Sequence, residues 1–156
     1  MPWFKRSSGA EPPPEPAPEV ARPTIEPLSA AEVAWVRSTV VGLAEQDVLD
    51  HNIDDLGRHY DELLSVWLRL READRPDPTN VITQIGLAFG QYVVDQAGLE
   101  WVVATGAGGP EIALHRPQGD LLVYPTAMIA ERWAAEAQGV LPPLARATVE
   151  AVRPDF

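Results

Sequence analysis

The sequence contains no cysteine among its 156 residues. Disulfide bonds, thiolate catalysis and cysteine-ligated metal sites are therefore excluded. No apolar run approaches the roughly 18 residues that a membrane-spanning helix requires, and the basic N-terminal residues lack the apolar segment of a signal peptide. We therefore expect a soluble cytoplasmic protein, because a reducing compartment also suits a chain without cysteine.

Lysine is nearly absent, since eleven arginines accompany a single lysine, and 23 acidic residues give a formal net charge of −11. An acidic surface repels phosphate groups, so nucleic acids and anionic membranes are poor partners. Such a charge can serve solubility alone, or it can accelerate the approach of a basic protein partner. High arginine, alanine and valine content is typical of a GC-rich bacterium.

Half of the sixteen prolines lie in residues 1–28. Proline removes backbone donors and fixes φ, so this segment is predicted to be a disordered, extended leader. Trp3 and Phe4 are the candidate partner-binding residues, because an aromatic and basic tip on a proline tether can dock on another protein. The alternative is that this terminus has no binding role. Residues 29–156 remain for a single globular domain.

Two helices are predicted first. Ser29 and Glu32 match the capping box that begins a helix, and apolar residues then recur at helical spacing to about Leu49. A second helix with a broad apolar face is capped by Asn52 or Asp54 and stopped by Pro-Asp-Pro. Short connections favour antiparallel neighbours, so the sequence predicts an N-terminal helical hairpin.

A third helix, from Pro78 to Gly98, carries Gly86 and Gly90 four residues apart. Both glycines lie on one helix face, where another backbone can approach closely. Each costs about 1 kcal/mol of helix stability relative to alanine, so we expect the sheet or a helix of the hairpin to press against this face. A ligand bound there is the alternative.

Three short strands follow at residues 99–105, 111–116 and 121–124, joined by two tight turns. This spacing predicts an antiparallel meander. The glycine run after the first strand leads into another strand rather than a helix, so it is a hairpin turn and not a phosphate-binding loop. One or two C-terminal helices complete an α+β domain.

Three sequence stretches, GLAFGQYVV, GLEWVV and LLVYPTAMIAERW, follow one another between residues 80 and 133. As a set they resemble a bacterial family of domains of unknown function (thirty-eight-oh-six). The resemblance implies a small bacterial α+β domain and carries no activity or catalytic residues with it. It also implies a polar, often acidic residue in the first hairpin turn, where this chain has Gly106-Ala107-Gly108-Gly109.

A metal site is one candidate function. Asp55, His59 and Glu62 are spaced so that all three share a helix face, as ligands of a hard or borderline cation could. The alternative is an exposed, charged helix start, where carboxylates favour the positive end of the helix dipole. A matching ligand motif on another helix is missing, so we expect no metal and no cofactor.

A ligand pocket near the sheet is a second candidate. Glu100, His115, Tyr124 and Arg132 could line it together. Alternatively, Arg132 pairs with a carboxylate and His115 is a polar residue at the sheet edge. The sequence has no G-x-S-x-G turn and no histidine in a catalytic motif, so no catalytic residue is assigned.

These observations favour a non-enzymatic protein-interaction domain with an acidic surface and a basic protein partner, in an adaptor, accessory or immunity-type role. The first alternative is a small enzyme or small-molecule binder with its site near the sheet. The second is a helical metal-binding site.

Overall fold

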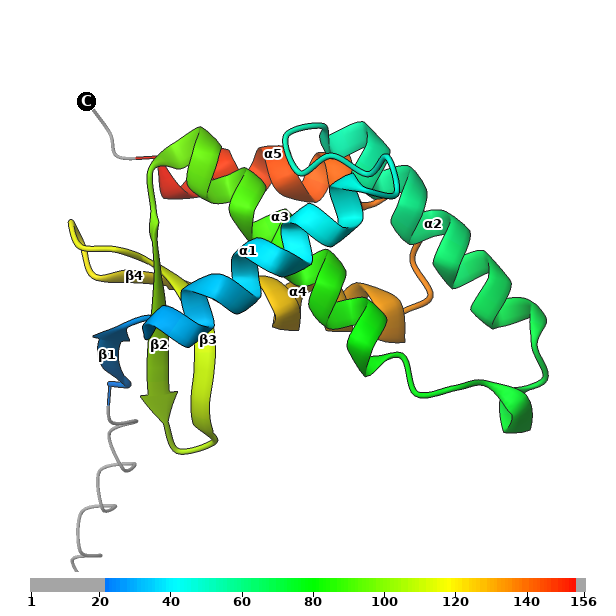
Figure 1. Cartoon of the computed structure of the whole chain (residues 1–156), viewed down its shortest axis with the longest axis horizontal. Helices are drawn as coiled ribbons and strands as arrows, with labels where there is room; N and C mark the ends of the chain where they lie inside the picture. Colours follow the sequence, from blue (N-terminus) through cyan, green and yellow to red (C-terminus); the bar gives the residue numbers. More distant parts are fainter. Residues whose placement is uncertain (1–21, 154–156) are drawn as a thin grey trace, which may run out of the picture.

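The computed structural model of the chain describes residues 22–153 (Figure 1). These residues form an α+β domain with five α-helices and one antiparallel sheet. The elements in chain order are β1 (Thr24–Pro27), α1 (Ala30–Ala44), α2 (Ile53–Arg69), a 3₁₀ turn (Glu72–Asp74), α3 (Thr79–Ala97), β2 (Glu100–Gly106), β3 (Gly109–Arg116), β4 (Leu121–Val123), α4 (Pro125–Ala134) and α5 (Leu141–Val152).

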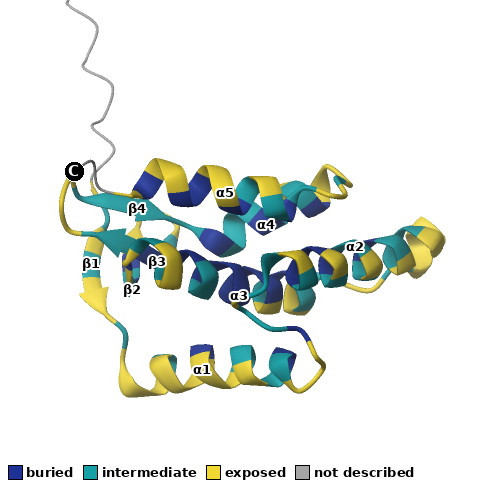
Figure 2. Cartoon of the chain, turned by 90° about the horizontal axis from the view of Figure 1, so that it is seen from above, coloured by how far each residue is buried: buried dark blue, intermediate teal, exposed yellow. Residues whose placement is uncertain are grey.

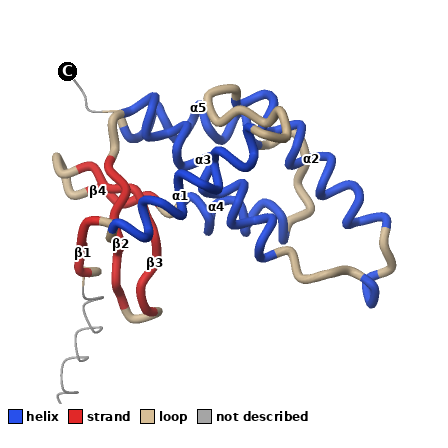
Figure 3. Tube along the Cα trace, viewed as in Figure 1, coloured by secondary structure: helices blue, strands red, loops and turns tan. Residues whose placement is uncertain are grey.

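The strands gather at one end of the molecule and the helices at the other (Figure 3). Trp3 and Phe4 lie outside the described residues, so the docking role and the disorder predicted for the leader stay predictions. Within residues 22–153, no helix combines the length and hydropathy needed to cross a bilayer.

The sheet has four strands in the order β1-β2-β3-β4, and each neighbouring pair is antiparallel. The meander predicted for the last three strands is confirmed, but the strand count of three was wrong. Residues 24–27, assigned to the proline-rich leader, form β1, in which Ile25 lies opposite Ala104. Pro23 and Pro27 are compatible with this position because an edge strand has one side without ladder bonds.

The sheet is curled. β1 and β4 are its opposite edges, yet Arg22, just before β1, forms an ion pair with Asp120, just before β4. Because Trp101 meets Gly90 of α3 and side chains alternate along a strand, Val102 lies on the opposite face of the sheet, where a small second core forms. Its buried residues are Val102, Ala104 and Ala113, and the half-buried residues packed on them are Ile25, Leu122 and Tyr124.

The predicted helical hairpin is wrong, because α1 and α2 both pack against α3 instead of pairing with each other. α2 also packs against α5, and Figure 2 shows α1 standing apart on the other side of α3. The reason is that α3 offers apolar surface on nearly its whole circumference, which lets several elements use it at once. Its buried residues are Ile82, Ile85, Gly86, Leu87, Ala88, Phe89, Gly90 and Val93.

The close approach predicted at the two glycines of α3 is confirmed. A Cβ on Gly86 would lie 2.7 Å from Cα of Thr126, at the start of α4, and a Cβ on Gly90 would lie 3.0 Å from Cζ2 of Trp101, in β2. α4 and the sheet therefore press on this face of α3. Gly98 ends the helix with φ of 75°, the left-handed conformation that glycine adopts without strain.

Local capping also follows the sequence. The Ser29 side chain accepts a hydrogen bond from the Glu32 backbone N–H at 3.1 Å, and the Glu32 carboxylate accepts one from the Ser29 N–H at 2.8 Å. Asn52 caps α2 by accepting from the Asp55 N–H at 3.2 Å. These side chains satisfy backbone donors that the first helical turn leaves unpaired, which fixes where both helices begin.

Candidate functional site

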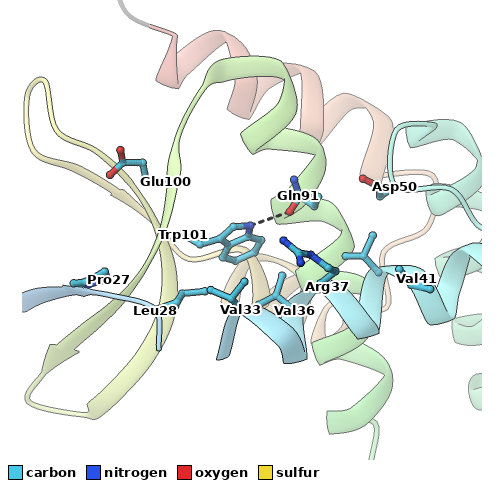
Figure 4. A pocket seen from close by; sticks show the side chains of 11 residues that line it. Pro27, Leu28, Val33, Val36, Arg37, Val41, Asp50, Gln91, Glu100 and Trp101 are labelled. Atoms are coloured by element: carbon cyan, nitrogen blue, oxygen red, sulfur yellow. Dashed lines mark hydrogen bonds between the residues drawn. The ribbon is translucent and has the colours of Figure 1, made fainter. Parts of the chain in front are cut away.

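A cavity of about 620 Å³ lies between α1 on one side and α3 with the start of β2 on the other (Figure 4). The link between β1 and α1 and the loop after α1 complete its walls. The lining residues are Pro27, Leu28, Val33, Val36, Arg37, Val40, Val41, Asp50, Gln91, Glu100 and Trp101.

Trp101 forms the floor of the cavity, and its orientation is fixed by hydrogen bonds. Its indole N–H donates to Oε1 of Gln91 at 3.0 Å, and Nε2 of Gln91 donates to Oδ1 of Asp95 at 2.9 Å. Gly90 gives the ring room against α3. Because the indole donor is already paired, the floor presents mainly an apolar aromatic surface.

The α1 wall is apolar and partly open to solvent. Val36 is buried, whereas Val33 and Val41, at the rim, are 40% and 50% exposed. Trp35 is 46% exposed on the same helix. α1 therefore carries apolar side chains on most of its circumference, although it packs only against α3 among the helices.

Three charged residues line the cavity. Arg37 projects from α1 toward Trp101 and Gln91, and Asp50 lies at the opposite end from Glu100 (Figure 4). Neither Arg37 nor Asp50 takes part in an ion pair among those formed by residues 22–153. Glu100 contributes to the wall, but its carboxylate points away from the Trp101 ring.

This lining has the composition of a binding pocket. A mainly apolar lining with a few polar groups is the usual composition of a ligand or anchor pocket. Serine, threonine and histidine are missing from the described residues that line it. The cavity can hold an apolar group while its rim contacts a charged one.

The four ligand-binding residues predicted from the sequence are only partly brought together. Glu100 and His115 lie opposite each other in the β2–β3 ladder. Tyr124 instead lines a shallow apolar groove between α4 and α5, and Arg132 pairs with the neighbouring glutamate on α4 at 3.1 Å. Only Glu100 lines the cavity described above.

His115 belongs to a charged cluster that joins the two edges of the sheet. Its Nε2 lies 2.9 Å from Oδ1 of Asp120, whose other oxygen pairs with Arg22. The hydrogen bond from His115, and secondarily the charge of Arg22, lower the pKa of the Asp120 carboxyl below its ordinary value. The cluster therefore holds the start of β1 against the turn before β4.

The predicted metal ligands are not assembled into a site. Asp55 pairs with Arg58 at 3.2 Å, and the pKa of half-buried His59 is lowered by burial, with Glu62 opposing that effect. Among residues 22–153, no group of three or more histidine or acidic side chains could hold a metal ion. Of the three predicted ligands, Asp55 lies in the first turn of α2, where a carboxylate favours the positive end of the helix dipole.

Sequence reasoning missed most of the cavity. The candidate ligand-binding residues predicted from the sequence include neither Trp101 nor any valine of α1. A signal was present, since Val33 and Trp35 lie on nearly opposite sides of the helix, and a single neighbour cannot cover both.

A family model described as a domain of unknown function (DUF3806) matches residues 62–141, just over half of the chain. The match runs from within α2 to the first residue of α5 and contains all three motifs that suggested the resemblance. It includes the cavity floor at Gln91 and Trp101 but neither β1 nor α1. No curated protein and no solved structure matches the chain.

Proposed function

The chain belongs to the DUF3806 family, and from its charge and its cavity we propose that it is a non-enzymatic protein-interaction domain with a basic protein partner. An adaptor, accessory or immunity-type role in a bacterial cytoplasm fits this proposal. The partner inserts an apolar anchor into the cavity between α1 and α3 and covers the outer face of α1.

The exposed apolar surface of α1 carries the proposal. Among the described residues, five large hydrophobic side chains are exposed, and three of them, Val33, Trp35 and Val41, lie on α1. Val33 and Val41 also form the rim of the cavity. Exposed apolar residues gathered beside a concave surface are typical of a protein-binding site, because the bound partner removes them from water.

The charge around the cavity supports a basic partner. Glu45 and Asp47 are exposed just after α1, and Asp50 lines the cavity end. The net charge of the whole chain is −11. A partner with lysine or arginine next to its apolar anchor would be attracted to this end, and its association would slow as salt rises.

The test is affinity capture with matched variants at low and moderate salt. Val41→Asp places a charge at the cavity rim, whereas Val66→Asp places the same charge on α2, where Val66 is 56% exposed and lines no part of the cavity. We expect wild type and Val66→Asp to retain one basic protein that is lost at higher salt, and Val41→Asp to lose it. Equal capture by both variants, or no salt-sensitive protein, would overturn the proposal.

A small-molecule binder is the second candidate, favoured by the size of the cavity. Its volume of about 620 Å³ falls in the range of ligand pockets, about 300–1,000 Å³. A screen of small molecules against thermal unfolding tests it. A compound that raises the unfolding temperature of wild type and of Val66→Asp, but not of Val41→Asp, would support this candidate, since Val41 and Val66 are similarly exposed and only Val41 lines the cavity.

A further inference from the structure

β1 and α1 form an N-terminal arm, defined here as residues 22–44, which lies outside the family match. The arm meets the rest of the domain at four places. β1 pairs with β2, Ile25 packs on the second core, α1 packs against α3, and Arg22 forms an ion pair with Asp120. One wall of the cavity therefore belongs to the arm and its floor to the family domain.

The arm is held by little buried surface. β1 has four residues, none of them buried, and α1 buries only Val36 and Leu43. Of these two, Leu43 alone belongs to the main core, so the arm contributes a single buried side chain to it. By comparison, α3 buries eight residues. Because burial of apolar area is the main source of stability, separating the arm costs far less than unfolding the core, and such segments open in local steps.

Opening of the arm would change the binding site directly. Ala104, 2% exposed, lies opposite Ile25 of β1 and would become accessible. The edge of β2 would lose its partner strand, and the Trp101 floor would lose the α1 wall. The concealed part of the cavity is then open to a group too large to enter past the valine rim.

We propose that the arm opens as a unit while residues 53–152 stay folded, and that this opening admits the partner's anchor to the cavity. The Arg22–Asp120 pair acts as the latch of the closed state. The fraction of molecules with an open arm then sets the apparent affinity, because only that fraction is competent to bind. The second half of this inference rests on the proposed function, whereas the opening itself does not.

Thiol labelling tests the opening, because the chain has no native cysteine. Ala104→Cys places a thiol in the second core, next to Ile25 of β1. Ala145→Cys is the control, because Ala145 is 0% exposed in α5, which packs on α2 and α3. We expect the thiol at 104 to react at least about tenfold faster than the thiol at 145 under native conditions, as local opening requires. Equal labelling rates at positions 104 and 145 would overturn the proposal, since both thiols would then be exposed only by global unfolding.

Two further substitutions separate local from global opening. Arg22→Gln removes the latch and should accelerate labelling at position 104 about 1.5- to fivefold, the effect of losing an exposed ion pair. Tyr60→Phe weakens the main core and should accelerate labelling at 145 but not at 104. The proposal would be contradicted if Tyr60→Phe raised the labelling rate at position 104, or if Arg22→Gln left that rate unchanged.

Hydrogen exchange on the unsubstituted chain tests the same opening independently, so a folding defect in the cysteine variants cannot affect this result. The amides of α1 and of Val102–Thr105 should exchange faster than those of Ile85–Val93 in the centre of α3. Uniform protection across these segments would overturn the opening of the arm.

A disulfide lock tests the consequence for binding. Ile25 and Ala104 are register partners, and facing residues of antiparallel strands have Cα atoms about 4.5–5.5 Å apart, which suits a disulfide. The Ile25→Cys/Ala104→Cys variant should capture the basic protein when reduced and lose it when oxidised. Equal capture in both states would overturn the role of opening. Failure of wild type to capture any protein would instead refute the proposed function and leave the labelling result standing.

Discussion

Gly86 should not tolerate a single added methyl group, although alanine is the better helix former. In α3, a Cβ at this position would lie 2.7 Å from Cα and 2.8 Å from Oγ1 of Thr126. Ordinary contact begins at 3.4 Å, so α4 would have to withdraw by about 0.7 Å. The obstructing atom belongs to the backbone, and a rotamer change cannot relieve it.

The two opposing effects of Gly86→Ala can be compared. Alanine improves helix propensity by about 1 kcal/mol relative to glycine. Forcing a methyl group into a packed interface costs typically about 1–3 kcal/mol. The overlap is with backbone, which places the cost in the middle of that range or above it. We therefore expect a net loss of about 1 kcal/mol in the free energy of unfolding.

Gly42→Ala is the matched control, because it makes the same chemical change in α1, where nothing lies within 4 Å of the added Cβ. It should gain about 0.5–1 kcal/mol from propensity alone. Urea unfolding of wild type and both variants, followed by far-UV circular dichroism, measures the difference. Opposite signs with equal m-values are expected. A Gly86→Ala protein as stable as Gly42→Ala would refute the packing argument for α3 and α4.

Three further changes follow from single side chains. Tyr60→Phe removes the hydroxyl that donates to the Ala137 carbonyl at 3.0 Å, so urea unfolding should show that the free energy of unfolding falls by about 1–2 kcal/mol. Burial raises the pKa of Tyr60 to about 12, so the free energy of unfolding of the wild type should also decline as the pH rises from 10 toward 12. Burial lowers the pKa of His59, so the free energy of unfolding should fall as the pH drops below about 6.5, and this dependence should weaken in His59→Gln. The pKa of Asp120 is lowered, chiefly by the hydrogen bond from His115. As the pH falls below the ordinary aspartate pKa, the free energy of unfolding of the wild type should therefore fall toward that of Asp120→Asn. If the free energies of the two proteins changed in parallel with pH, this reasoning would be contradicted.

Local elements were predictable wherever a few neighbouring residues determine them. The capping box at Ser29 and the left-handed Gly98 fixed the beginning of one helix and the end of another. The period-two and helical patterns placed β2, β3, β4 and α3 close to their observed bounds. Gly86 and Gly90 indicated a close approach before its partners were known, because glycine within a helix needs a packing reason.

The partners across the fold were not predictable in the same way. β1 pairs with residues about 80 positions away along the chain. Its four residues, in a proline-rich segment, are too few for a period-two alternation that would predict a strand. The hairpin prediction failed because a short connection makes two helices pack together only when no other element offers their apolar faces a larger apolar surface. For α1 and α2, α3 offers that surface. Of the predicted ligand-binding residues, only Glu100 lines the cavity, since that site depends on where α1 docks.

The sequence by itself determined an acidic, cysteine-free α+β chain, its helix caps, its meander and the small residues of α3. Each of these is a short-range property, fixed by propensity, periodicity and backbone conformation within a few residues. The tertiary structure decided which apolar faces meet, how the sheet curls so that Arg22 reaches Asp120, and where a cavity remains beneath α1. These depend on the competition between distant surfaces for burial, because hydrophobic burial is non-directional and takes its geometry from the whole fold.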